Sequence, residues 1–185
     1  GPGRLFPLLT VERELQHLDT MIREANSRLY AERLAMGKNM ATTLVLVRFW
    51  HGKALIGHVG DSRLYCRREG RLIRLTADHS LAEELHRQGL LSADQVGYSP
   101  HRHVVTRALG AEPTVTPTLR SFPLAAGDLL LLCTDGLTSM VNDEAIHRRL
   151  CQNGVGCGQM VRQLVDQANE AGGRDNITVI VLAID

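Results

Sequence analysis

Apolar residues recur at steps of three and four near the start of the chain, which is typical of one buried stripe on a long amphipathic helix. The stripe consists of Val11, Leu15, Leu18, Ile22, Ala25 and Leu29. We expect Thr10 to cap the start of this helix, with Glu12 and Glu14 in its first turns, and Gly37 to end it. The helix is expected to cover a core.

Short β-branched and apolar runs follow, separated by turns that contain glycine. Closely spaced strands with short turns between them indicate antiparallel hairpins. The expected strands are 42–50, 54–60, 63–68, 72–75, 119–124, the continuous apolar run that starts at 129, and 177–184. The run at 129 shows no polar alternation, so we expect a strand that is buried on both faces.

Helical patterns interrupt the strands and follow them. Residues 81–88 form the first, Ser92 starts a short second helix through a capping-box pattern, and Asn142 caps a third. The last helix carries its apolar face at Met160, Val161, Leu164, Val165 and Ala168. Because strands and helices are grouped and do not strictly alternate, the sequence predicts an α+β fold with mostly antiparallel sheets. No linker is evident, so we expect a single domain over residues 4–185.

Composition narrows the class of protein. With 185 residues, of which 44% are apolar and 22% charged, the chain reads as an ordinary globular protein with one full core. A net charge of +1 and the lack of a long basic run predict no nucleic-acid partner. No apolar run is long enough to span a bilayer, which predicts no membrane partner. Four cysteines without a Cys-x-x-Cys spacing predict a cytoplasmic protein without disulfides.

Three aspartates stand where a strand meets a turn that contains glycine: Asp61, Asp135 and Asp175. A carboxylate at the end of a buried strand must be paired or must hold a cation. Each one alone is also explained by a polar turn, for Asp61 with a pairing to Arg63. Together they offer the oxygen ligands that Mg²⁺ or Mn²⁺ prefers, and two such ions can activate water against a phosphate. The sequence carries no motif of a protein nucleophile or a nucleotide-binding loop.

Three histidines, His79, His101 and His103, surround the helical insertion and raise a second possibility for metal binding. Their spacing matches no zinc signature. We therefore interpret them as surface or hydrogen-bonded histidines in preference to metal ligands.

Five stretches of the sequence, taken in order, are similar to motifs of a known protein family. They are His58–Tyr65, Leu75–Leu81, Val105–Gly110, Leu132–Leu137 and Gly173–Val179. Together they resemble the metal-dependent serine/threonine protein phosphatases of the PPM (type 2C) family in its short bacterial form, over nearly the whole chain from about Leu15 onward. The resemblance implies two antiparallel sheets sandwiched between helices. It also implies hydrolysis of phosphoserine and phosphothreonine by a metal-bound water at a binuclear Mn²⁺ or Mg²⁺ centre.

The resemblance also implies roles for single residues. Asp135 and Asp175 would be core metal ligands and would act in catalysis through the metal-bound water. Asp61 would help to bind the third, weaker metal of bacterial members. Asn176 and Gly136 would lie behind these ligands.

Residues 80–103 would form the family's mobile flap. Its expected substrate-binding residues are Ser80, His101, Arg102 and His103. The partner implied by this resemblance is a phosphorylated protein, the substrate of a bacterial serine/threonine kinase.

One departure from the family matters. The family begins with an Arg-x-x-Asn-Glu-Asp strand and an Asp-Gly-x-Gly-Gly turn, and this chain contains neither. We therefore expect the chain to be an incomplete portion of a phosphatase, weak or inactive alone. The alternative is a catalytically dead pseudophosphatase that binds phosphoproteins as a signalling module.

Overall fold

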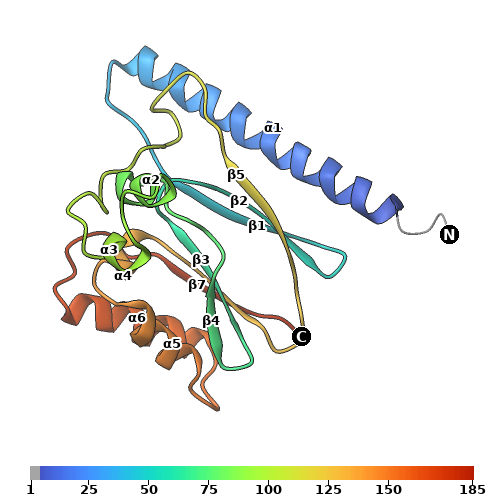
Figure 1. Cartoon of the computed structure of the whole chain (residues 1–185), viewed down its shortest axis with the longest axis vertical. Coiled ribbons are helices and arrows are strands. Elements are labelled where there is room, and N and C mark those ends of the chain that lie inside the picture. The colour runs from blue at the N-terminus through green and yellow to red at the C-terminus, as the bar shows by residue number, and fades with distance from the viewer. Residues whose placement is uncertain (1–4) are drawn as a thin grey trace. The chain divides into compact units, whose positions relative to one another are not determined.

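The computed structural model describes the backbone of residues 5–185 and the side chains from Thr10 onward (Figure 1). The chain divides into two compact units, and each is described by itself. The first comprises the chain up to Gly60 together with His79–Pro123, and the second comprises Asp61–Asp78 together with Leu124–Asp185. The single domain over 4–185 stays a prediction. Within the described residues, no helix is both long and apolar enough to cross a membrane.

The first unit consists of a long helix on a three-stranded antiparallel sheet, with two short helices after the sheet's first hairpin. Its elements are α1 (Leu5–Met36), β1 (Leu44–Trp50), β2 (Lys53–Val59), α2 (Leu81–Arg87), α3 (Ala93–Val96) and β5 (Thr118–Pro123). The strand order is β1-β2-β5. Helix α1 packs on β2 and β5 through the predicted stripe, in which Val11, Leu18 and Ile22 are buried (Figure 1).

The ends of α1 test the capping predictions. The helix ends at Met36, and Gly37 follows with a φ of 61°, so the predicted glycine stop is confirmed. The predicted start at Thr10 is wrong, because the helix begins at Leu5. Pro7 does not prevent this earlier start, since a proline in the first turn lacks only an N–H that has no acceptor there.

The sequence did not predict one buried polar residue on α1, Asn26. Asn26 is 1% exposed, and its amide nitrogen donates to the carbonyl oxygens of Glu112 and Pro113 at 3.1 and 3.3 Å. Its Oδ1 accepts from the N–H of Gly110 at 2.9 Å. Asn26 therefore fastens the loop before β5 to the helix and satisfies backbone groups that would otherwise be buried without partners.

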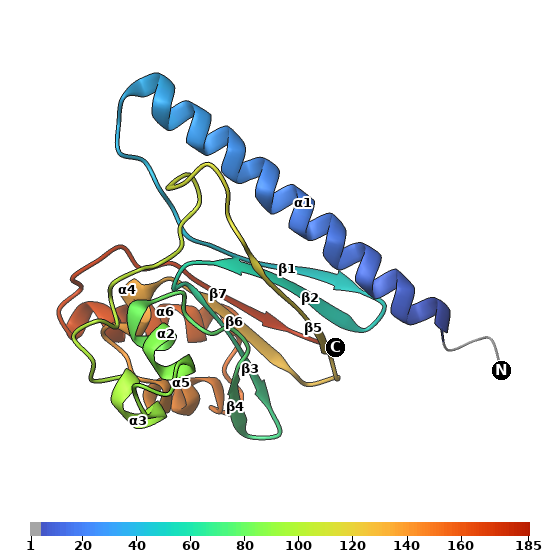
Figure 2. The ribbon, with the colours of Figure 1, turned by 45° about the horizontal axis from the view of Figure 1, so that its top comes forward.

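The second unit is a four-stranded antiparallel sheet with helices packed on it (Figure 2). Its elements are β3 (Arg63–Arg68), β4 (Arg71–Arg74), β6 (Leu129–Cys133), α4 (Asp135–Thr138), α5 (Asp143–Leu150), α6 (Cys157–Glu170) and β7 (Val179–Ala183). The strand order is β4-β3-β6-β7, with α5 against β4 and α6 against β7. Asn142 caps α5 by accepting from the N–H of Ala145 at 2.9 Å, as predicted. The predicted α+β class with antiparallel sheets is confirmed.

The apolar run at 129 behaves as predicted. Strand β6 lies between β3 and β7, and Leu130 and Leu131 are both fully buried. The core around it includes Tyr65, Leu137, Ile146, Leu150 and Leu164. Two buried faces explain why this strand lacks polar alternation.

A buried ion pair between Arg68 and Asp128 stabilises the turn before β6. Asp128 is 1% exposed and accepts from Arg68 at 2.6 and 2.8 Å and from the N–H of Ala125 at 2.9 Å. The hydrogen bonds from Arg68 hold the pKa of Asp128 below its ordinary value. The ionised carboxylate therefore stabilises the fold above the unfolded pKa of about 4, and this stabilisation is lost as the pH falls through the lower folded pKa.

We expect Asp128→Asn to lower the free energy of unfolding by about 2 kcal/mol at neutral pH, because charge-assisted hydrogen bonds are lost. The deficit should shrink as the pH falls below about 4. Urea unfolding at several pH values measures both effects. The control is Asp19→Asn, which breaks an exposed pair with Arg23 of the same 2.6 Å length and should change nothing measurable. Equal deficits for the two variants would contradict the buried-pair account.

Candidate metal site

The pairing of β3 with β6 brings two of the predicted aspartates, Asp61 and Asp135, to the same end of the sheet. In this register Arg63 pairs with Cys133 and Tyr65 with Leu131. Asp61 lies two residues before Arg63, and Asp135 lies two residues after Cys133. Two aspartates from distant parts of the sequence therefore lie just beyond the same end of the four-stranded sheet.

The electrostatics of Asp61 agree with this placement. Asp61 is 8% exposed, and burial raises the pKa of its carboxyl above the ordinary value. The charge of Asp135 raises this pKa further, and Asp78 adds a smaller effect in the same direction. The site thus holds more negative charge than its own residues neutralise, which favours a bound cation.

Arg63 does not neutralise the pair in the way that the alternative interpretation expected. The predicted pairing of Asp61 with Arg63 is replaced by a pairing of Arg63 with Asp78, at 2.8 Å from Nη2 to Oδ2 and 3.1 Å from Nε to Oδ1. Asp78 is buried and also forms an ion pair with Arg74, at 2.5 Å between Oδ1 and Nη2. Because the guanidinium group of Arg63 is hydrogen-bonded to Asp78, Arg63 lowers the pKa of Asp61 only weakly.

The third aspartate reaches the same end of the sheet by way of β7. Cys133 pairs with Val179, so the chain before β7 runs back past the chain after β6. A Cβ on Gly136 would lie 2.2 Å from the carbonyl oxygen of Asn176 and 3.4 Å from that of Asp175. Only glycine permits this approach of two backbones. Thr134 reinforces it, because its hydroxyl donates to the carbonyl of Asn176 at 3.2 Å.

Asp175 itself differs from the other two aspartates. It is exposed, and its Oδ1 accepts from the N–H of Asn176 at 2.7 Å. Asp175 lies in the turn before β7, as the sequence predicted, but because it is exposed its carboxylate is solvated and needs neither an ion pair nor a cation. Asn176 is likewise exposed, whereas Gly136 is buried.

These residues fit a divalent cation as part of a ligand set. Two carboxylates at the same end of the sheet, one of them buried, supply the hard oxygen ligands that Mn²⁺ or Mg²⁺ prefers. In the part of the chain that the structure describes, no three His, Cys, Asp or Glu side chains gather as a group that could hold a metal ion. Asp61 and Asp135 are thus brought together, and the carboxylate of Asp175 does not complete a group of three with them.

Buried thiols offer no alternative chemistry here. Burial raises the pKa of Cys66 to about 11 and that of Cys133 to about 12. Both lie inside β3 and β6 and stay protonated at neutral pH, and a protonated thiol is a poor nucleophile. All four cysteines are free in this structure.

The predicted flap lies in the first unit and contains α2 and α3. Ser80 is 2% exposed, and its hydroxyl accepts from the N–H of Glu83 as the N-cap of α2, so it supports the flap and does not face solvent. His101, Arg102 and His103 are exposed, and His101 also lines a mainly apolar hollow of about 630 Å³ between α2 and α3. These three side chains are accessible to a partner.

The three histidines are hydrogen-bonded or exposed, the two kinds of position that the sequence analysis preferred. His79 is buried and hydrogen-bonded, with Nδ1 accepting from the N–H of Gly60 at 3.1 Å and Nε2 lying 2.8 Å from the hydroxyl of Thr118. His101 and His103 are exposed. The sequence did not predict that His79 lies between Gly60 and Thr118. The only indication was the polar run around His79.

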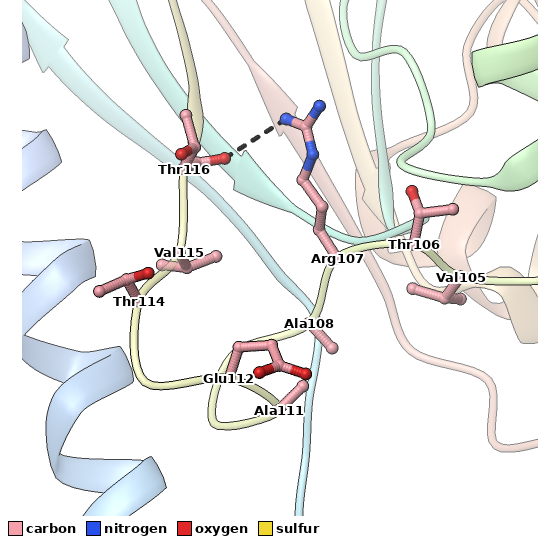
Figure 3. A pocket seen from close by; sticks show the side chains of 9 residues that line it. All are labelled: Val105, Thr106, Arg107, Ala108, Ala111, Glu112, Thr114, Val115 and Thr116. Atoms are coloured by element: carbon pink, nitrogen blue, oxygen red, sulfur yellow. Dashed lines mark hydrogen bonds between the residues drawn. The ribbon is translucent and has the colours of Figure 1, made fainter.

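A second hollow, of about 610 Å³, lies in the first unit beside the Val105–Gly110 stretch. Figure 3 shows Arg107 pointing toward Thr116, to whose carbonyl its Nη1 donates at 3.4 Å. Glu112 also lines this hollow, so its wall carries both signs of charge. The hollow alone does not define a ligand.

Comparison with known proteins identifies the family of the chain. The family model described as "Protein phosphatase 2C" matches residues 8–171. A serine/threonine phosphatase, stp, of Listeria innocua is 37% identical over 177 residues, which cover 95% of this chain and 70% of that protein.

Solved structures give the same result. The serine/threonine phosphatase of S. agalactiae superposes with a TM-score of 0.84 at 32% identity, covering 91% of this chain and 69% of that one. The catalytic domain of the serine/threonine protein phosphatase PstP, in complex with two manganese ions, gives a TM-score of 0.79 at 33% identity, covering 92% of this chain and 72% of that one. The chain belongs to the protein phosphatase 2C family, whose members among these relatives are serine/threonine phosphatases.

Proposed function

We propose that this chain is the metal-dependent catalytic portion of a protein phosphatase that hydrolyses phosphoserine and phosphothreonine, and that Asp61, Asp135 and Asp175 supply its metal ligands. The observation that supports the proposal is that Asp61 and Asp135 follow the same end of the β3–β6 pair and that the charge of Asp135 raises the pKa of Asp61. The two manganese ions in the PstP structure support Mn²⁺ or Mg²⁺ as the cofactor. A bound divalent ion supplies a Lewis acid that polarises the phosphate and makes a bound water acidic.

Different residues of this chain bind the cation, fix the turn that carries Asp175 and attract the substrate. Asp61 and Asp135 bind the cation, and the burial of Asp61 keeps bulk water away from it, which strengthens the interaction. The close approach of Asn176 to Gly136 fixes the turn that carries Asp175. The exposed cationic side chain of Arg102, with His101 and His103 beside it, attracts the phosphorylated segment of a protein substrate. The opposing enzyme is a bacterial serine/threonine kinase.

A second function, binding of a phosphoprotein without turnover, is favoured by one observation. Among residues 5–185, no three ligand side chains form a group suited to a metal. As a phosphatase, the chain alone is expected to bind metal weakly and to hydrolyse phosphoesters slowly, whereas a pseudophosphatase releases no phosphate. A pseudophosphatase would retain the flap as its binding element.

Titration of the chain with a phosphoserine peptide separates the two functions. We measure binding by fluorescence anisotropy and released phosphate colorimetrically, with Mn²⁺ or EDTA, and use the unphosphorylated peptide as the control. Slow phosphate release that requires Mn²⁺ supports the phosphatase. Stable binding with no release supports the signalling module, and rapid release by the chain alone contradicts the partial ligand set.

A further inference from the structure

Gly60, the residue just before Asp61, is held through both of its backbone polar groups and has no room for a side chain. The N–H of Gly60 donates to Nδ1 of His79 at 3.1 Å, and its carbonyl accepts from the N–H of His79 at 2.9 Å. The φ of Gly60 is 103°, and a Cβ there would lie 2.4 Å from Cγ2 of Thr43. Gly60 therefore cannot carry a side chain, and both of its backbone polar groups are fixed by one residue.

The ring of His79 is itself fixed. It stacks on His58 with centroids 4.6 Å apart and an angle of 19° between the planes, and both rings are buried. Because Nδ1 accepts the N–H of Gly60, the proton of the neutral ring lies on Nε2 and is donated to the hydroxyl of Thr118 at 2.8 Å. The nearby Nη1 of Arg107, 3.5 Å from Nε2, then faces another donor.

We propose that His79 is a positioning residue for the metal site: by clamping Gly60 it fixes the backbone from which the carboxylate of Asp61 projects. This inference rests on the proposed role of Asp61 as a metal ligand. Ligand oxygens must be held within about 0.5 Å of their productive positions, and groups that orient ligands typically change metal affinity by about 10- to 100-fold. His79 acts through the main chain, so it needs no contact with the metal.

Mn²⁺ dissociation constants of the 185-residue chain, measured by electron paramagnetic resonance, test this role. We expect His79→Ala to weaken binding about tenfold and to speed hydrogen exchange at the Gly60 amide. His79→Asn, whose Oδ1 can replace Nδ1 as the acceptor, should restore most of the affinity. The control is His147→Ala, which removes a different hydrogen-bonded histidine and should leave Mn²⁺ affinity unchanged.

The outcomes separate this inference from the proposed function. If Asp61→Asn weakens Mn²⁺ binding but folded His79→Ala does not, or if His79→Asn fails to rescue, the inference is overturned alone. If Asp61→Asn leaves Mn²⁺ binding unchanged, or the wild-type chain binds no Mn²⁺, the proposed metal role fails and the inference falls with it. If His79→Ala does not fold, Thr118→Val, which removes only the acceptor of Nε2, decides: weaker binding supports the clamp and unchanged binding overturns it.

Discussion

Asp135→Asn is expected to weaken Mn²⁺ binding by about a hundredfold or more, because a direct ligand is worth at least as much as the outer partners that orient it. The amide keeps the shape of the side chain but removes the charge that raises the pKa of Asp61. The same substitution should abolish phosphate release by any longer form of the protein that carries further metal ligands. Isothermal titration with Mn²⁺ and a phosphopeptide assay measure the two effects.

Asp166→Asn is the matched control, since it makes the same chemical change on the exposed face of α6. It should leave metal binding and phosphate release at the wild-type level. If Asp135→Asn behaves like Asp166→Asn in both assays, the assignment of Asp135 is refuted.

Gly136→Ala has the second large expected effect, a loss of about 2–3 kcal/mol in the free energy of unfolding. The new methyl group would lie 2.2 Å from the carbonyl oxygen of Asn176 and 2.9 Å from its carbonyl carbon, and backbone cannot move aside as a flexible side chain can. The turn that carries Asp175 should be displaced, so Mn²⁺ affinity should fall as well. Chemical denaturation and the Mn²⁺ titration measure the two changes.

Gly158→Ala provides the contrast for this prediction. Gly158 lies in α6, and no atom approaches within 4 Å of the position of an added Cβ. Alanine should therefore be neutral there or stabilise the helix by up to about 1 kcal/mol. Equal destabilisation by the two substitutions would show that the close approach of Asn176 is not the cause.

Element types were largely predictable because local patterns and core packing agree. The stripe on α1 and the apolar run of β6 each reflect a face that the fold buries. A capping residue alone did not predict where α1 starts. Thr10 can also lie inside a helix that begins earlier, and Pro7 hardly destabilises the first turn of that helix. Local signals place an element but do not fix its end when neighbouring residues also tolerate the helix.

The candidate site was predictable only in its chemistry. The recurrence of aspartate beside glycine pointed to Asp61 and Asp135, but their position at the same end of the sheet is a consequence of the pairing of β3 with β6. The partner of Arg63 depends on where Asp78 lies, and neighbours in sequence suggested Asp61 instead. Likewise, the burial of Ser80 and the exposure of Asp175 come from tertiary packing, which no local pattern reports.

The most direct test of the central claim is a double-mutant cycle of Mn²⁺ affinity on Asp61→Asn and Asp135→Asn. If the two carboxylates share one cation, each single variant should lose most of the affinity and the double variant little more, which is the non-additivity of residues that act together. Losses that simply add, or a wild-type affinity in either single variant, would contradict a shared metal site at this end of the sheet.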